Sequence, residues 1–137
     1  MPQLIEHIDA IARRKQRDVL YLSFFDDDAD WRRPGNWRAN PTRAQVIDWL
    51  DANGVGWCEC GEIASETAMR SYGGTLYLDV PFDLADPAYQ ALAAFLEHPD
   101  GTLRLPGMKF WAVSLEVAMR NAHHDEPGFW EAWAERF

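Results

Sequence analysis

The chain has 137 residues, a formal net charge of −9, 47% hydrophobic residues and 13% aromatic residues. This composition excludes a mainly disordered protein, because disordered chains lack the apolar side chains needed to collapse. No stretch approaches the roughly 20 uninterrupted apolar residues of a membrane-spanning helix, so we expect a single globular domain over residues 1–137.

The charge also narrows the classes of partner. A strongly acidic protein repels nucleic acid and anionic membranes, because both are bound through Lys and Arg. If there is a macromolecular partner, a basic protein is favoured. The charged N-terminal segment does not resemble a signal peptide, which predicts a cytoplasmic location.

The two local groups that resemble binding motifs have simpler interpretations. The cations Arg13, Arg14, Lys15 and Arg17 are expected to face the negative end of a first helix. Cys58 and Cys60 are one residue apart, which makes a poor disulfide and only half of a zinc site. We therefore expect both cysteines to be small buried apolar side chains.

The first half of the chain predicts a helix, a strand, a loop and a helix. Apolar spacing favours a helix over 3–15, and a run that is apolar on both faces favours a central strand over 18–25. Residues 26–41 are rich in turn-forming residues and predict a long loop. The next helix, 42–53, is expected to begin with Thr42 as its N-cap and Gln45 completing a capping box.

The second half predicts three more strands and two helices. Strands are expected over 55–63 and 75–82, with a helical turn over 64–71 between them. Asp86 followed by Pro87 predicts the start of a helix that continues to about residue 98. Segment 109–120 alternates like a strand but has the composition of a helix, and we expect a strand. A short helix is expected to end the chain.

This order predicts an α+β fold with a ferredoxin-like βαββαβ unit and extra N- and C-terminal helices. Its antiparallel sheet would have the strand order 4-1-3-2, with both inner helices on one face. The other face needs a cover. Either the terminal helices provide it or a second copy does, and the C-terminal aromatic residues favour a homodimer.

An acidic loop with two tryptophans is the first candidate site. Its carboxylates do not match the spacing of an EF-hand, so the alternatives are a weak cation site, a docking patch for a basic protein, or an ordinary solvated loop. Tryptophans in a polar loop either pack into the core or anchor a partner. The predicted partner-binding residues are Asp26, Asp27, Asp28, Asp30, Trp31 and Trp37.

A second candidate is the run His123-His124-Asp125-Glu126. Adjacent residues of an extended segment point to opposite sides and rarely share a metal, so helix capping by the acidic residues is the simpler interpretation. A sharper hypothesis pairs His124 with Asp125 as a general base. The strand directions place this run and the 61–73 connection at opposite ends of the sheet.

Two functions follow as hypotheses. The sequence has no phosphate-binding loop, dinucleotide fingerprint, zinc-protease motif or serine elbow. The absence of these motifs does not exclude an enzyme. The net charge of −9, the Asp26–Asp30 run and the loop tryptophans favour a first hypothesis, a non-enzymatic interaction protein of an inhibitor, immunity or regulatory type, without cofactor or metal. The alternative is a small-molecule binder or enzyme with a pocket between the open sheet face and the terminal helices. Its predicted lining is Trp57, Tyr77, Asp79 and Trp111.

Overall fold

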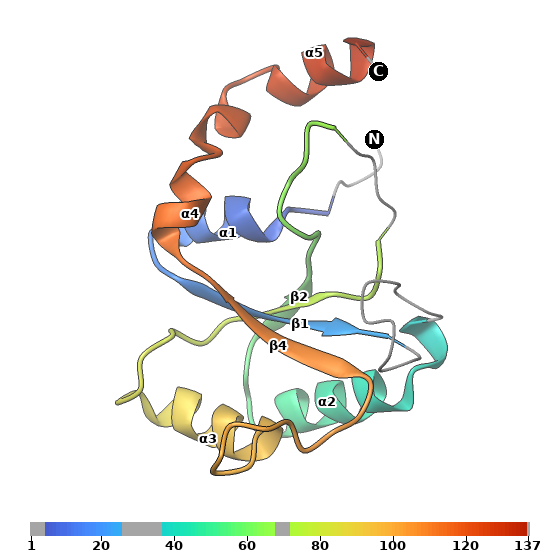
Figure 1. The fold of residues 1–137 in the computed structure, drawn as a ribbon, viewed down its shortest axis with the longest axis vertical. Coiled ribbons are helices and arrows are strands. Elements are labelled where there is room, and N and C mark those ends of the chain that lie inside the picture. The colour runs from blue at the N-terminus through green and yellow to red at the C-terminus, as the bar shows by residue number, and fades with distance from the viewer. Residues whose placement is uncertain (1–4, 26–36, 68–71, 137) are drawn as a thin grey trace.

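The computed structural model describes residues 5–25, 37–67 and 72–136, which are arranged around one four-stranded antiparallel sheet (Figure 1). The strands are β1 (Val19–Phe24), β2 (Trp57–Glu59), β3 (Leu76–Leu78) and β4 (Met108–Val113). Their order in the sheet is β2-β3-β1-β4. The α+β class and the predicted strand order, which is the same order read from the other edge, are confirmed.

Two helices cover one face of the sheet. They are α2 (Pro41–Ala52) and α3 (Pro87–Leu96), which lie together below the sheet in Figure 1. Alternate residues of the strands turn toward them, because successive side chains of a strand point to opposite faces. The resulting core contains Leu20, Leu22, Val46, Leu50, Leu76, Leu78, Leu92 and Leu96.

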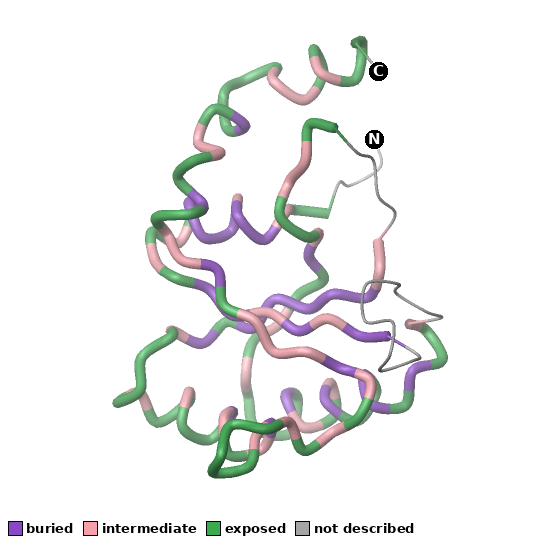
Figure 2. Tube along the Cα trace, viewed as in Figure 1, coloured by how far each residue is buried: buried purple, intermediate pink, exposed green. Residues whose placement is uncertain are grey.

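The other face is covered by the N-terminal helix α1 (Ile8–Lys15) and the short helix α4 (Leu115–Met119). Ile8, Ile11 and Ala12 are fully buried there, in a second core that includes Tyr77 and Val113. The chain thus covers this part of the sheet with its own terminal elements. The burial in Figure 2 follows the sheet and the inner sides of the helices around it.

The chain ends in two further helical segments beyond α4. These are the 3₁₀ helix η3 (Ala122–Asp125) and the α-helix α5 (Phe129–Arg136), which has no fully buried residue. Another 3₁₀ turn, η2 (Trp37–Ala39), precedes α2. None of the helices in the described residues has the length and apolarity needed to cross a membrane.

The predicted start of α2 was wrong by two residues. Its N-cap is Asn40, whose side-chain oxygen accepts a hydrogen bond of 3.0 Å from the Arg43 backbone N–H. Pro41 then takes the first helical position, where its missing N–H costs nothing. Thr42, the predicted cap, instead donates its hydroxyl to the Pro106 carbonyl at 2.8 Å.

The predicted strand over 109–120 was wrong in its second half. The strand ends at Val113, which pairs with Val19, the first residue of β1. No further residue of β1 remains for pairing, and Ser114 begins α4 by accepting a hydrogen bond from the Val117 backbone N–H. The backbone N–H of Leu115 donates to the Asp18 carboxylate. Beyond Val113, where β1 offers no further partner, the helix-favouring composition of the segment therefore decides its structure.

Other boundaries are shorter than predicted. β2 and β3 have three residues each, within the longer runs 55–63 and 75–82. The helix α1 begins at Ile8 rather than residue 3, and α3 ends at Leu96 rather than near 98. Residues 64–67 are not helical, and the rest of the predicted turn at 64–71 lies outside the described residues.

Candidate functional site

Most of the predicted acidic docking loop lies outside the described residues. This applies to Asp26, Asp27, Asp28, Asp30 and Trp31. Trp37 is described, and its ring packs edge-on against Tyr72 with centroids 4.9 Å apart. The guanidinium of Arg43 lies 4.5 Å from the ring centroid, and a side chain on Gly74 would collide with the ring. Trp37 is therefore a half-buried packing residue in this structure.

The sheet separates the four residues predicted to line a pocket. Trp57 packs against the core under α2 and α3, and its indole N–H donates to Asp51 at 2.8 Å. Tyr77 belongs to the core on the opposite face. Trp111 also lies on that face, stacked on Tyr21, and donates its indole N–H to Ser23. Trp57 therefore cannot share a cavity with the other residues.

Asp79 forms a polar cluster with Tyr77 at the edge of that face. Its carboxylate accepts from the Tyr77 hydroxyl at 2.9 Å and pairs with Arg17 at 2.8 Å and Lys15 at 3.4 Å. Burial would raise the pKa of Asp79, but the tyrosine hydrogen bond and the two cations lower it below its ordinary value. This arrangement keeps Asp79 ionised and its charge balanced.

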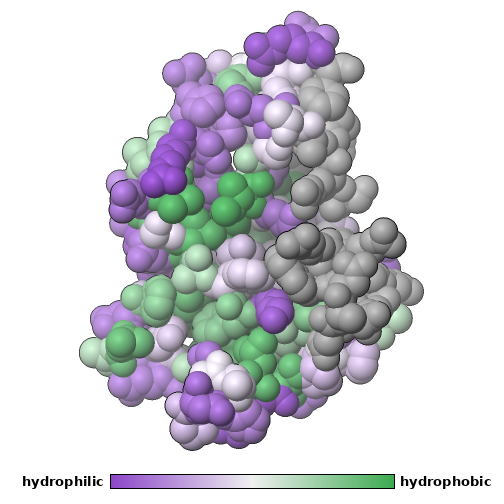
Figure 3. Space-filling view, viewed as in Figure 1, coloured by the Kyte–Doolittle hydropathy of each residue, from purple (hydrophilic) through white to green (hydrophobic). Residues whose placement is uncertain are grey.

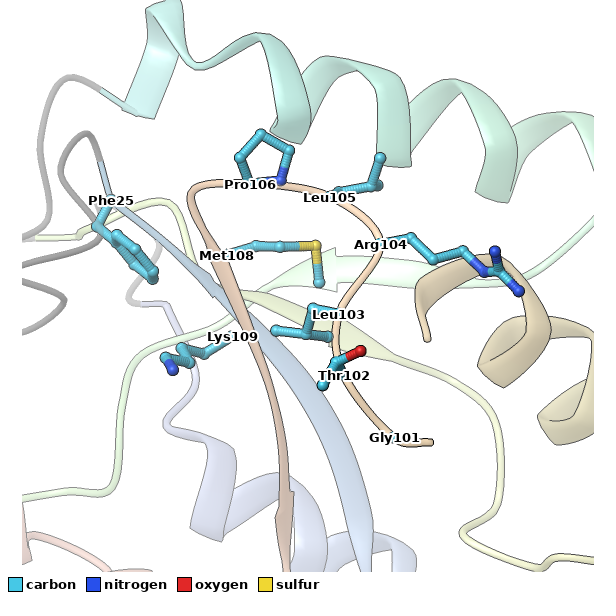
Figure 4. A pocket seen from close by; sticks show the side chains of 9 residues that line it. All are labelled: Phe25, Gly101, Thr102, Leu103, Arg104, Leu105, Pro106, Met108 and Lys109. Atoms are coloured by element: carbon cyan, nitrogen blue, oxygen red, sulfur yellow. The ribbon is translucent and has the colours of Figure 1, made fainter. Parts of the chain in front are cut away.

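A groove of about 580 Å³ lies elsewhere, at the connection between α3 and β4 (Figure 4). It is lined by Phe25, residues 101–106, Met108 and Lys109. Arg104 extends toward the end of α3, where its Nε donates to the carbonyls of Ala94 and Glu97. None of the four predicted pocket residues lines this groove, whose lining combines apolar residues with the polar side chains of Thr102, Arg104 and Lys109.

A cluster that the sequence analysis did not assemble joins the 61–67 loop to η3. Glu66 Oε1 lies 3.3 Å from His123 Nε2 and 3.5 Å from His124 Nε2. The adjacent histidines can face the same carboxylate because they lie on a 3₁₀ helix, where successive side chains are about 120° apart, rather than on an extended segment. Their ring centroids are 4.3 Å apart. The expectation that they point to opposite sides was wrong.

His124 is the buried member of this cluster. Its side chain is 2% exposed, and neither ring nitrogen has a hydrogen-bond partner among the described residues. The rings of Phe129 and Trp130 pack against it, with centroids 4.8 and 4.7 Å away. Burial, followed by the neighbouring His123, lowers the pKa of His124 below its ordinary value of 6.5. The imidazole is therefore neutral at pH 7.

Asp125, the acidic residue next to His124, is hydrogen-bonded to Arg13 and not to the histidine. The Asp125 carboxylate accepts two hydrogen bonds from Arg13, at 2.7 and 2.8 Å, and this interaction lowers the pKa of Asp125. Asp125 does not cap α5, which begins at Phe129. The capping interpretation and the His124–Asp125 general-base hypothesis are both contradicted for this residue.

The strand directions suggested that Glu66 and the histidines lie at opposite ends of the molecule, which was also wrong. After β2 the chain turns back along the start of α1, where the Ile8 backbone N–H donates to the Gly61 carbonyl at 3.0 Å. The indole N–H of Trp133 in α5 donates to the Glu66 carbonyl at 2.8 Å. These contacts bring the 61–67 loop to the C-terminal segment.

The surface around α2 and α3 is acidic. Residues 41–53 and 82–104, which form these helices and the loops beside them, contain six Asp or Glu and two Arg, namely Asp48, Asp51, Asp83, Asp86, Glu97 and Asp100 against Arg43 and Arg104. On the loop before α3, Leu84 is 72% exposed and Phe82 is 45% exposed. Figure 3 shows hydrophobic surface interrupted by hydrophilic patches on the viewed face, including the part beside α3.

The loop that presents these apolar side chains is held by local hydrogen bonds. Asp83 accepts from the Ala85 backbone N–H, and Asp86 caps α3 by accepting from Ala88 and Tyr89. Phe82 stacks on Tyr89 with ring centroids 5.5 Å apart. The two carboxylates thus fix the turn through hydrogen bonds from backbone N–H groups.

Comparison of the chain with protein-family models, with curated proteins and with solved structures gave no match. The geometry of the described residues is therefore the basis for assigning a function.

Proposed function

We propose that this chain is a non-enzymatic interaction protein, of an inhibitor, immunity or regulatory type, that binds a basic protein. The observation that carries the proposal is the excess of acidic residues on and beside α2 and α3, where residues 41–53 and 82–104 contain six Asp or Glu and two Arg. A surface with a net negative charge attracts a basic partner from a distance and repels acidic competitors.

We also infer that the sheet with α2 and α3 is a ferredoxin-like domain. The strand order, the antiparallel neighbours and the position of both helices on one face support this inference. The fold does not itself imply a reaction, because such scaffolds carry unrelated functions. The cytoplasmic location remains part of the proposal. Cys60 is buried as predicted, whereas the prediction that Cys58 is buried was wrong, because Cys58 is exposed.

The loop 81–86 is the proposed point of contact on the acidic surface. Phe82 and Leu84 expose apolar area on both sides of Asp83, within a turn that hydrogen bonds already hold. A pre-formed loop loses little conformational entropy on binding, and apolar side chains surrounded by charge are typical of interface anchors. Asp26, Asp27, Asp28, Asp30, Trp31 and Trp37 remain predicted contributors to the same kind of interface.

The experiment is affinity capture from the cells that express the chain, followed by titration with the purified captured protein. We expect a basic protein whose affinity falls as salt is raised, because ions screen exposed charges. The double variant Phe82→Ala with Leu84→Ala should bind at least about tenfold more weakly, as expected for a loss of about 1.4 kcal/mol at an anchor.

The matched control removes two apolar side chains on the other side of the sheet. Val117 and Met119 of α4 are 38% and 46% exposed, and the double alanine variant should bind like the unmodified protein. The proposal is wrong if the captured protein is acidic, if its affinity is insensitive to salt, or if both double variants weaken binding equally.

A further inference from the structure

The Glu66–His123–His124 cluster has a feature that the interaction function does not use, which is a buried imidazole without a partner. Both ring nitrogens of His124 are buried and lack a hydrogen bond among the described residues. Leaving a buried donor or acceptor unpaired is unfavourable, so native structures pair almost all such groups with protein, water or an ion. His124 Nε2 faces the Glu66 carboxylate at 3.5 Å, which is too long for a good hydrogen bond.

We propose that Glu66, His123 and His124 bind a zinc-class divalent cation, with a fourth coordination position left to water or to a group from a ligand. Each residue offers one ligand atom, and these three atoms lie within 4.8 Å of one another. The site is independent of the acidic surface around α2 and α3, since it lies on the other side of the sheet, at the C-terminal end of the chain.

The distances between the ligand atoms fit a tetrahedral ion. Bonds of about 2.0–2.1 Å from zinc to nitrogen and oxygen, arranged tetrahedrally, place two ligands of one ion about 3.3–3.4 Å apart. The carboxylate oxygen of Glu66 lies 3.3 Å from His123 Nε2 and 3.5 Å from His124 Nε2. Two of the three edges therefore already have the length that an ion requires.

The donor types select the class of metal. Two imidazoles and one carboxylate suit Zn²⁺ and its neighbours Co²⁺ and Ni²⁺, whereas Mg²⁺ and Ca²⁺ prefer all-oxygen sites. Neither cysteine belongs to the group of candidate ligands in the described residues.

The residues around the cluster hold the ligands in place. Phe129 and Trp130 pack against the His124 ring, and Trp133 donates to the Glu66 carbonyl at 2.8 Å. Outer contacts of this kind orient ligands and strengthen metal binding. A bound cation would link the 61–67 loop to η3 and would therefore stabilise the attachment of the C-terminal segment.

The test is calorimetric titration of the full chain, treated with a chelator and dialysed, with Zn²⁺. We expect one Zn²⁺ per chain and a rise in the melting temperature with Zn²⁺ concentration, because the ion binds the folded state. Glu66→Gln and His123→Ala should each weaken binding by at least about 100-fold, since even outer-shell losses reach 10–100-fold. Both positions are exposed, so these variants should fold, which circular dichroism checks.

The matched controls are Glu131→Gln and His98→Ala, two exposed residues outside the cluster. They should bind Zn²⁺ like the unmodified chain. Co²⁺ provides an independent readout, because a tetrahedral nitrogen and oxygen site gives strong visible absorption that the Glu66 and His123 variants should lose. The proposal is overturned if Zn²⁺ does not bind at one per chain, or if the cluster variants bind it as tightly as the controls.

Discussion

Arg13 joins three parts of the chain through a single guanidinium group. Its side chain is 3% exposed to solvent. It pairs with Asp9 at 3.0 Å within α1 and donates a hydrogen bond to the Ala118 carbonyl at 2.9 Å. Its other nitrogens hold Asp125 after α4. The fork of an arginine can serve several acceptors at once, whereas a lysine offers a point charge. Arg13 thus fixes α1 against α4 and η3.

Replacing Arg13 by Met should be strongly destabilising. The substitution keeps the apolar stem but leaves the fully buried Asp9 without its cation, and breaking a buried pair in this way costs about 3 kcal/mol or more. Urea unfolding measures the change in the free energy of unfolding. The adjacent variant Arg14→Met is the control, because its pair with Glu6 is exposed and should contribute less than about 1 kcal/mol. Equal losses in the two variants would contradict the role of Arg13.

The same network predicts how stability depends on pH. The hydrogen bonds from Arg13 hold the pKa of Asp125 below its ordinary value of 3.8. A carboxyl whose pKa is lower in the folded state stabilises the protein above that ordinary value, and this stabilisation is lost as the pH falls through the folded pKa. We therefore expect the free energy of unfolding to decrease as the pH is lowered below about 4.

The variant Asp125→Asn isolates this contribution. It removes the titrating group, so its stability should fall less steeply than that of the unmodified chain as the pH decreases over the same range. Urea midpoints at a series of pH values measure both slopes. Identical slopes would show that Asp125 does not titrate with a lowered pKa.

At the scale of elements, α3 begins where the sequence predicted and for the predicted reason. Asp86 accepts hydrogen bonds from the backbone N–H groups of Ala88 and Tyr89, at 2.8 and 3.1 Å, and Pro87 takes the first helical position. These groups would otherwise lack partners at the helix start. A helix cap of this kind can be predicted from sequence, because the backbone N–H donors lie only two and three residues after the carboxylate that accepts from them.

Asp86→Ala should lower the free energy of unfolding by about 1 kcal/mol, since it removes the cap of α3. Thermal or urea unfolding measures the loss. Asp48→Ala is the matched control, because Asp48 is an exposed residue in the middle of α2 and its loss should change stability by less than about 0.5 kcal/mol. A larger loss for Asp48 than for Asp86 would contradict the cap.

The elements that were predicted incorrectly depend on contacts between distant residues. Alternating apolar residues over 109–120 predict a strand, but a strand needs a partner, and β1 provides pairs only as far as Val19. Ser114 is a good N-cap residue, and the sequence contained that signal. The shift of the α2 cap from Thr42 to Asn40 has a similar cause, because the Thr42 hydroxyl is used by Pro106, 64 residues away.

At the scale of the whole molecule, the sheet divides the protein into two cores. The order of the predicted helices and strands, together with the usual handedness of their connections, allowed the strand order and the helix-covered face to be predicted from sequence. The Glu66–His123–His124 cluster could not be predicted, because Glu66 reaches the histidines only through the return of the chain along α1. The adjacent histidines were the one signal present in the sequence, and their shared direction depends on the 3₁₀ turn that holds them.

The helices α1 and α4 cover the face of the sheet opposite α2 and α3, and this packing determines whether a single chain is stably folded without a second copy. Ile11 is fully buried between α1 and the sheet, in a core built from this chain alone. Ile11→Ala should therefore lower the free energy of unfolding by about 2–5 kcal/mol, the cost of a buried cavity. Leu50→Ala in the core under α2 is the matched comparison and should cost a similar amount.

The dependence on protein concentration distinguishes an internal cover from a second copy. If α1 covers the face within one chain, the urea midpoints of the unmodified chain and of Ile11→Ala should not change with protein concentration. If a homodimer covered this face, both midpoints would rise with concentration, because association stabilises the folded state by mass action. The buried positions of Ile8, Ile11 and Ala12 favour the first outcome, and a rising midpoint would restore the predicted homodimer.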